Sequence, residues 1–223
     1  MKSALLFGST GLVGSLLLRE LLADAGYGRI TAVVRRRPAT PDPRVSYVVA
    51  DLATLPAVKA GLVADDVFIA IGTTKDKTPD RAEYARIDHD YPVLAARLAK
   101  ENGARCVCLV SAVGADAGSS TFYLRTKGET DRDVIALGFA HTHVFRPSQL
   151  LGDRGERRPL EKALMALMPA LDPLLRGRLS IYRGVAAVDV ARAMHAAAGD
   201  DTRKVAIHHW REIQALAHGA TPG

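Results

Sequence analysis

The sequence predicts a doubly wound α/β fold, in which helices cover both faces of a parallel sheet. Short apolar segments alternate along the chain with segments that have the apolar spacing of helices. A glycine-rich turn joins the first strand to the first helix. The segment 66–71 is nearly all apolar, which is typical of a parallel strand buried on both faces. Together these observations predict a parallel sheet whose strands are connected through helices.

Composition excludes several classes of protein. The 223 residues suit one domain, and 48% of them are hydrophobic, which is enough for a sizeable core. The net charge of +6 is spread along the chain and aromatic residues make up only 5%, so we expect no nucleic-acid surface. The two cysteines, Cys106 and Cys108, are expected to be buried thiols on one face of a strand, in a reducing compartment. We find no cleavable signal peptide and no apolar stretch of 18 residues, which favours a cytoplasmic protein without a membrane span.

The first strand, 4–7, runs into the turn Gly8-Ser9-Thr10-Gly11-Leu12-Val13-Gly14, and helical spacing continues to residue 25. In this context Gly8 allows a tight turn, Gly11 a close approach of backbone to a pyrophosphate, and Gly14 close packing of helix on sheet. The free N–H groups at the start of the helix would hold the pyrophosphate. We therefore expect all seven residues of the turn to bind a dinucleotide; the alternative is a turn whose glycines serve packing alone.

The second strand, 30–34, is followed at once by Arg35, Arg36 and Arg37. NAD-binding units carry an acid at about this distance, roughly twenty residues after the glycine turn, whereas an arginine accepts the 2′-phosphate of NADP. A guanidinium binds phosphate bidentately, so Arg35 and Arg36 favour NADP(H) over NAD(H). The alternative is a surface turn, which the prolines that follow support.

Two further strands end in candidate cofactor contacts. The third, 45–49, leads to Asp51 and Leu52, where the carboxylate would either accept a hydrogen bond from an adenine amino group or cap the next helix. The fourth, 66–71, ends in Gly72, Thr73 and Thr74, where small residues leave room for a cofactor.

A helical pattern then runs from Thr78, the expected cap, to Gly103. Pro92 interrupts it, which predicts a kink or break near Asp88. A fifth strand, 105–110, ends at Ser111, at the edge where open α/β sheets bind ligands.

We expect catalytic residues in the segment 120–137, where Tyr123 and Lys127 lie four residues apart on one face of a helix. A phenol has a pKa of about 10, and lowering it by about three units needs about 4 kcal/mol of preferential stabilisation of the phenolate. A neighbouring ammonium and a positive nicotinamide ring supply energy of that order in a partly dry site. Ser111 would hold the substrate carbonyl oxygen.

These motifs resemble the short-chain dehydrogenase/reductase superfamily, and in particular the atypical group of Tat-interacting-protein-like oxidoreductases and their bacterial relatives. The resemblance rests on stretches that span most of the chain: 6–11, 71–74, 86–91, 111–115, 123–129 and 144–147. It implies a Rossmann fold that binds NADPH, with Tyr123 and Lys127 at the nicotinamide ribose and Pro147 lining the nicotinamide end. The asparagine that the superfamily usually carries in the kinked helix is not evident, and Asp88 lies in about that region.

The remaining segments are interpreted from pattern alone. We expect a sixth strand over 141–145, a loop or lid over 151–159, a short helix over 160–168, a helix over 188–198, a last strand over 205–208 and a last helix over 210–217. His208 and His209 lack a third ligand, so no metal site is expected. Residues 1–147 would form the cofactor-binding core and residues 148–223 a substrate-side lobe, not independent, within a single domain 1–223.

The sequence thus predicts an NADP(H)-dependent oxidoreductase that acts on a small carbonyl or alcohol. In reduction, hydride passes from the nicotinamide to the carbonyl carbon, Tyr123 donates the proton, Lys127 lowers its pKa and Ser111 orients the oxygen. Two alternatives stay open: a sugar-nucleotide epimerase or dehydratase with retained NAD, and an NADPH-binding regulatory protein with vestigial catalysis. The sequence specifies neither the substrate nor the oligomeric state.

Overall fold

A seven-stranded parallel sheet forms the centre of the protein in the computed structural model, which describes residues 1–74, 76–152 and 177–219. The strand order is β3-β2-β1-β4-β5-β6-β9, and every pair of neighbouring strands is parallel. The order reverses beside β1, between β1 and β4, as in doubly wound sheets. The predicted fold class is therefore confirmed.

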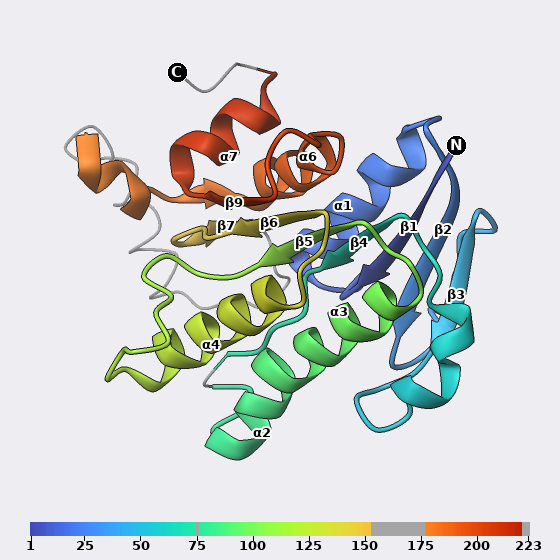
Figure 1. The fold of residues 1–223 in the computed structure, drawn as a ribbon, viewed down its shortest axis with the longest axis horizontal. Helices are drawn as coiled ribbons and strands as arrows, with labels where there is room; N and C mark the ends of the chain where they lie inside the picture. The colour runs from blue at the N-terminus through green and yellow to red at the C-terminus, as the bar shows by residue number, and fades with distance from the viewer. Residues whose placement is uncertain (75, 153–176, 220–223) are drawn as a thin grey trace.

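The elements follow one another with short connections in the described part of the chain (Figure 1). The strands of the large sheet are β1 (Lys2–Phe7), β2 (Tyr27–Val34), β3 (Val45–Val49), β4 (Asp66–Ile69), β5 (Cys106–Val110), β6 (His141–Phe145) and β9 (Val205–His208). The helices are α1 (Leu12–Ala23), α2 (Arg81–Ala85), α3 (Tyr91–Glu101), α4 (Phe122–Ala136), α6 (Ala187–Ala197) and α7 (Trp210–Ala217). Smaller elements are the 3₁₀ turns η1 (Leu55–Gly61) and η4 (Gly177–Tyr182), the π-helical turn η2 (Arg86–Asp90), and the two-residue strands β7 (Leu150–Leu151) and β8 (Val185–Ala186).

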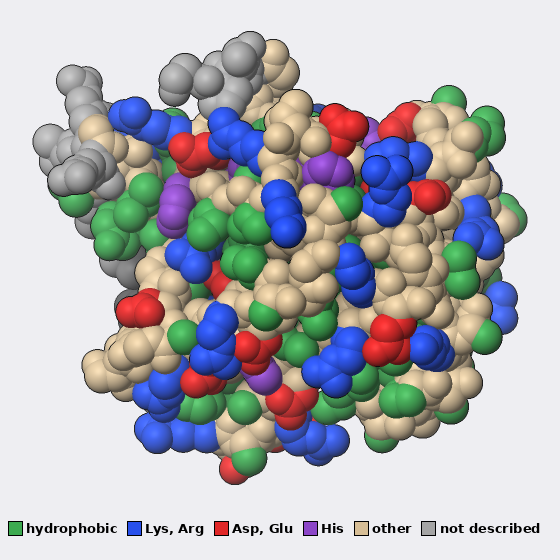
Figure 2. All heavy atoms as spheres, viewed as in Figure 1, with side chains coloured by type: hydrophobic (Ala, Val, Ile, Leu, Met, Phe, Trp, Pro, Cys, Tyr) green, Lys and Arg blue, Asp and Glu red, His purple; other side chains and the backbone are tan. Residues whose placement is uncertain are grey.

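Helices cover the two faces of the sheet because successive strand residues point to opposite sides. On β1, Ala4 and Leu6 face one hydrophobic cluster, and Leu5 and Phe7 face another. The first cluster packs under α1, α6 and α7, and the second under α3, α4 and η1. Acidic and basic side chains are interspersed over the outward face that Figure 2 shows. No helix among residues 1–74, 76–152 and 177–219 is long and apolar enough to cross a bilayer.

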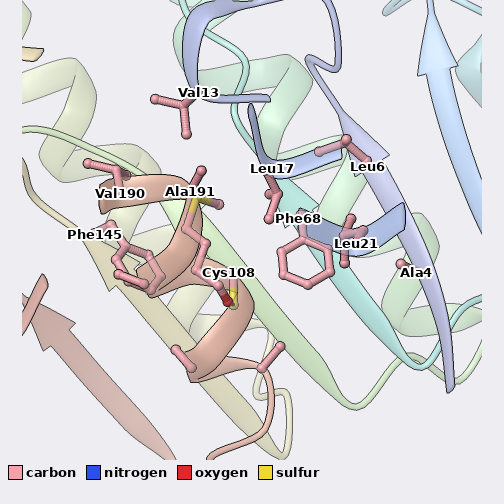
Figure 3. Close-up of a cluster of buried hydrophobic side chains, with 14 of the residues drawn as sticks. Ala4, Leu6, Val13, Leu17, Leu21, Phe68, Cys108, Phe145, Val190 and Ala191 are labelled. Carbon is pink, nitrogen blue, oxygen red and sulfur yellow. The ribbon is translucent and has the colours of Figure 1, made fainter. Parts of the chain in front are cut away.

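The cluster under α1 and α6 joins the N-terminal and C-terminal parts of the chain (Figure 3). Leu17 of α1, Phe68 of β4 and Phe145 of β6 are fully buried there. Cys106 and Cys108 lie in the same cluster as free, buried thiols, as the two-residue spacing predicted. β9 then extends the sheet beside β6, so residues beyond 185 complete the same layered structure.

Element bounds agree closely with the predictions, with two informative differences. The strands 45–49, 141–145 and 205–208 and the helix 210–217 are as predicted. β2 begins earlier, at Tyr27, because β1 pairs with it from Lys2 onward. The expected cap at Thr78 is wrong: Asp80 caps α2, its carboxylate accepting the N–H of Glu83 at 2.8 Å.

The predicted break near Asp88 is confirmed and takes the form of the π-helical turn η2. Pro92 has no N–H to donate to the Asp88 carbonyl four residues back. The Thr130 hydroxyl of α4 donates to that carbonyl instead, at 2.8 Å. The turn is thereby tied to α4, which carries Tyr123 and Lys127. The predicted helix over 160–168, and the predicted lid from residue 153 on, lie outside the described residues.

Candidate functional site

The glycine turn leaves the N-terminus of α1 uncapped. Gly11 is the N-cap residue and provides no side-chain cap, and the first turn of α1 contains no acid. Gly8 has a φ of +87°, and a Cβ there would lie 2.5 Å from the Ala70 carbonyl oxygen. A Cβ on Gly14 would lie 2.1 Å from the carbonyl oxygen of Gly8. Both positions therefore require glycine, and the close packing leaves the first N–H groups of α1 available to an anion.

An open pocket of about 910 Å³ begins at this turn, a volume within the roughly 300–1,000 Å³ of ligand sites. Its described lining comes from the carboxyl ends of β1, β4, β5 and β6 and from the start of α4. The residues concerned are those of the segments 10–13, 70–74, 77–79, 110–112, 121–123 and 147–148, together with Ser15, Arg81, Tyr84, Asp88, Lys127 and Leu150.

The three predicted catalytic side chains line this one pocket. Ser111 follows β5, while Tyr123 and Lys127 lie one turn apart in α4. Tyr123 is 42% exposed, and its ring meets the Tyr84 ring edge-on at 6.4 Å between centroids. A phenol held by an aromatic neighbour and open to the pocket is accessible to a substrate.

Lys127 is buried and paired with a carboxylate that sequence reasoning located only by region. Its Nζ lies 2.6 Å from Oδ1 of Asp88, which is 0% exposed. The other oxygen of Asp88 accepts the Thr73 N–H at 2.8 Å. Burial on its own lowers the pKa of Lys127, but the Asp88 carboxylate, helped by Tyr123, reverses this effect and raises the pKa above its ordinary value. The lysine is therefore held as an ammonium at neutral pH.

A second buried carboxylate lies behind Ser111. Asp131, one turn after Lys127 on α4, accepts a hydrogen bond from Nε of Arg146 at 2.9 Å and lies within ion-pair distance of its Nη2. Burial raises the pKa of Asp131, and the Ser111 hydroxyl and the Arg146 guanidinium oppose that rise. The sequence offered no signal for this cluster, because Asp131 looks like an ordinary polar position of a helix.

The remaining predicted cofactor contacts fall into two groups. Thr10, Gly11, Leu12, Val13, Gly72, Thr73, Thr74 and Pro147 line the pocket. The other predicted contacts lie outside the described pocket lining: Gly8, Ser9 and Gly14, which belong to the packed turn itself, and Arg35, Arg36, Asp51 and Leu52. Asp51 closes a local turn ahead of η1, in which Oδ1 accepts the N–H groups of Ala53 and Thr54 at 3.0 and 2.9 Å; it does not cap η1, whose N-cap residue is Thr54 and which has no side-chain cap. Arg35 and Arg36 are exposed directly after β2.

The residues of the pocket suit a nicotinamide dinucleotide. Gly8 and Gly14 are packed so closely that any side chain would clash, and the helix start that follows the turn has no side-chain cap. Gly72 lines the pocket next to the ion pair, where an added Cβ would lie 3.5 Å from Oδ1 of Asp88 and 3.8 Å from Nζ of Lys127. Comparison with known proteins agrees with this assignment.

The NAD(P)H-binding family model matches residues 8–168, and the chain belongs to this family. The chain is 31% identical over 224 residues to "Protein FMP52, mitochondrial" of Eremothecium gossypii, covering 96% of each chain. It is 36% identical over 164 residues to "Protein HTATIP2" of Rattus norvegicus, covering 72% of this chain and 67% of the relative. The predicted resemblance to the atypical, Tat-interacting-protein-like short-chain dehydrogenase/reductase group is thereby confirmed.

Solved structures confirm the Rossmann fold. The enzyme WbmH of Bordetella bronchiseptica, in complex with NAD+, superposes with a TM-score of 0.70 at 17% identity, covering 94% of this chain and 76% of that one. UDP-glucuronic acid 4-epimerase of Bacillus cereus, in complex with NAD, gives 0.67 at 14% identity, with 93% and 77% covered.

The predicted cytoplasmic location is wrong by this comparison, because the fungal relatives are named as mitochondrial proteins. The prediction rested on the missing signal peptide and the free thiols. Free thiols indicate a reducing compartment, but they do not indicate which reducing compartment it is.

Proposed function

We propose that the protein is an NADP(H)-dependent oxidoreductase that interconverts a small carbonyl compound and its alcohol. The observation that carries the proposal is the pocket that joins an uncapped, glycine-lined helix start to Ser111, Tyr123 and Lys127. A nicotinamide bound there would supply the hydride. The chain's own residues would bind the dinucleotide, orient the carbonyl group and provide the proton.

Each residue of the triad has a role that its surroundings support. Ser111 would donate a hydrogen bond to the carbonyl oxygen, and Tyr123, open to the pocket, would donate the proton to it. Lys127 would favour the phenolate electrostatically, because Asp88 keeps it charged. Asp88 touches no reacting atom in this scheme and is a positioning residue.

The preference for NADP(H) rests on Arg35 and Arg36, whose exposed guanidinium groups follow β2 at the place of the ribose contact. We also propose that residues 148–223 contribute the substrate side of the pocket, which Ser148 and Leu150 already line.

The alternative of a sugar-nucleotide epimerase is favoured by the structural neighbours, several of which are described with NAD and nucleotide-sugar ligands. A retained cofactor distinguishes it: the epimerase predicts NAD that stays bound through purification, whereas the proposed reductase predicts exchangeable NADPH. A regulatory protein with a vestigial triad predicts tight NADPH binding and no turnover.

Calorimetric titration with NADPH and NADH, followed by a panel of aldehydes and ketones monitored by nicotinamide absorbance, tests the proposal. We expect binding of NADPH tighter than that of NADH, and turnover that falls by at least about 100-fold in Tyr123→Phe. Tyr47→Phe, which removes a phenol hydroxyl on β3 outside the described pocket lining, serves as the matched control and should leave turnover unchanged. Turnover that survives intact in Tyr123→Phe would contradict the proposed role of the phenol.

A further inference from the structure

The pocket has a cationic wall at the junction of α2 and α4, away from the glycine turn. Arg81 and Tyr84 lie three residues apart on α2, and Phe122 and Tyr123 begin α4. All four side chains line the pocket. The Arg81 guanidinium lies 5.4 Å from the centroid of the Phe122 ring, and the Tyr84 ring contacts the rings of both Phe122 and Tyr123 at 5.7 and 6.4 Å.

These contacts link the Arg81 guanidinium to the phenol of Tyr123 through two rings. A guanidinium held against an aromatic face keeps its N–H groups directed outward at its edge. The wall is therefore built to present hydrogen-bond donors in the same pocket as the proposed proton donor.

No acid neutralises Arg81 within the described part of the chain. The neighbouring acids on α2 have other partners: Asp80 caps the helix, and Glu83 pairs with Arg86 at 3.0 Å. Among the described charged residues that line the pocket, Lys77, Arg81 and Lys127 are basic, and Asp88, which pairs with Lys127, is acidic. The described lining thus carries more basic than acidic side chains.

Within this wall, Arg81 is separate from the groups expected to hold the phosphates of the cofactor. The pyrophosphate belongs at the start of α1, and the additional phosphate of NADP belongs near Arg35 and Arg36, after β2. Arg81 lies instead on the side of Tyr123, where the substrate must present its carbonyl group.

We propose that Arg81 recognises an anionic group on the substrate, so that the natural substrates are carbonyl compounds that carry a carboxylate or a phosphate. The inference rests on the proposed function. Planar, bidentate contact with either anion is the recognition for which guanidinium is suited.

The test compares aldehydes matched in shape and different in charge: 4-carboxybenzaldehyde, its neutral methyl ester, and 4-formylphenyl phosphate. We expect a higher kcat/KM with one or both anionic aldehydes than with the ester. In Arg81→Gln the ratio of anionic to neutral kcat/KM should fall about 10- to 100-fold, the range for losing a charge-assisted hydrogen bond. Arg86→Gln, which removes the same charge from a residue paired with Glu83, should leave that ratio within about twofold.

A binding arm separates this inference from the proposed catalysis. Calorimetry measures the affinity of the wild type, Arg81→Gln and Arg86→Gln for two alcohols, 4-(hydroxymethyl)benzoate and its methyl ester. Each titration is done with and without saturating NADPH. Preference for the carboxylate that is lost only in Arg81→Gln supports the subsite even if no aldehyde is reduced. The proposed anion subsite would be overturned if the wild type bound and reduced the anion and the ester equally well. It would also be overturned if both variants lost the preference for the anion to the same extent. A loss of NADPH affinity in Arg81→Gln alone would assign the arginine to the cofactor and overturn it as well.

Discussion

Replacing Asp88 by Asn tests the buried ion pair beneath the proposed active site. Asp88 and Lys127 lie 2.6 Å apart, and both are buried. Unit charges at that distance attract by about 6 kcal/mol at an effective dielectric constant of about 20. Leaving one partner of a buried pair uncompensated typically costs about 3–5 kcal/mol. We therefore expect Asp88→Asn to lower the free energy of unfolding at pH 7 by about 3–5 kcal/mol.

The pH dependence of that loss identifies the group responsible. In the wild type the pKa of Lys127 is raised. The stabilisation of the folded state by the charged lysine is therefore complete below the ordinary lysine pKa, and it is lost only as pH rises through the higher pKa of the folded state. Without Asp88, burial lowers the pKa of Lys127 below its unfolded value, so the unfolded state binds the additional proton. The free energy of unfolding of the variant should then rise with pH over the interval below the ordinary lysine pKa of about 10.4, by up to about 1.4 kcal/mol per pH unit.

Urea denaturation followed by far-ultraviolet circular dichroism measures both effects. The double variant Asp88→Asn/Lys127→Met removes both charges and serves as the control. It should be more stable than Asp88→Asn alone at pH 7 and should lack the additional pH slope. If the single variant loses less than about 1 kcal/mol, or if its pH slope matches that of the double variant, the ion pair does not hold the lysine charged.

Three further predictions concern other parts of the molecule. The His208 ring stacks on Phe145, and its Nε2 lies 3.0 Å from Nδ1 of His143. Burial lowers the pKa of His208 to about 4. Because the unfolded chain then binds the proton more readily, the free energy of unfolding should fall by about 3 kcal/mol as pH falls from about 6.5 to about 4. Urea denaturation of His208→Gln should show a flatter dependence over that interval; an unchanged slope would contradict this origin. Gly14→Ala places a Cβ 2.1 Å from a backbone oxygen and should abolish NADPH binding in calorimetry, whereas wild-type affinity would refute the requirement for glycine at this turn. Replacing Arg35 and Arg36 by alanine should lower the affinity for NADPH about tenfold or more and leave the affinity for NADH within about twofold. Equal loss of affinity for both nucleotides would remove the basis of the NADP(H) preference.

Sequence reasoning located the fold and the part of the pocket formed by the glycine turn, the strand ends and α4, because these features depend on local patterns. Glycine spacing, strand ends and the four-residue interval between Tyr123 and Lys127 are short-range features whose positions follow from the order of the strands. The break near Asp88 was equally local, since a proline removes one specific helical hydrogen bond.

The pairings between distant segments were not accessible in the same way. Asp88 and Lys127 belong to different helices, and Asp131 meets Arg146 only after β6 has joined the sheet. The Arg81 wall depends on how α2 packs against α4, which no periodicity specifies. Buried charges in particular look like surface charges until tertiary packing reveals their partners.

The central claim is that a nicotinamide nucleotide binds with its pyrophosphate at the start of α1 and its reactive ring beside Tyr123. A crystal structure of the complex with NADPH tests it most directly. We predict phosphate oxygens within hydrogen-bond distance of the backbone N–H groups of Leu12 and Val13, since the Gly11 N–H already donates to the Gly8 carbonyl, and we predict the nicotinamide against the Tyr123 hydroxyl. A dinucleotide bound elsewhere, or a Tyr123 phenol turned away from the nicotinamide, would contradict this claim.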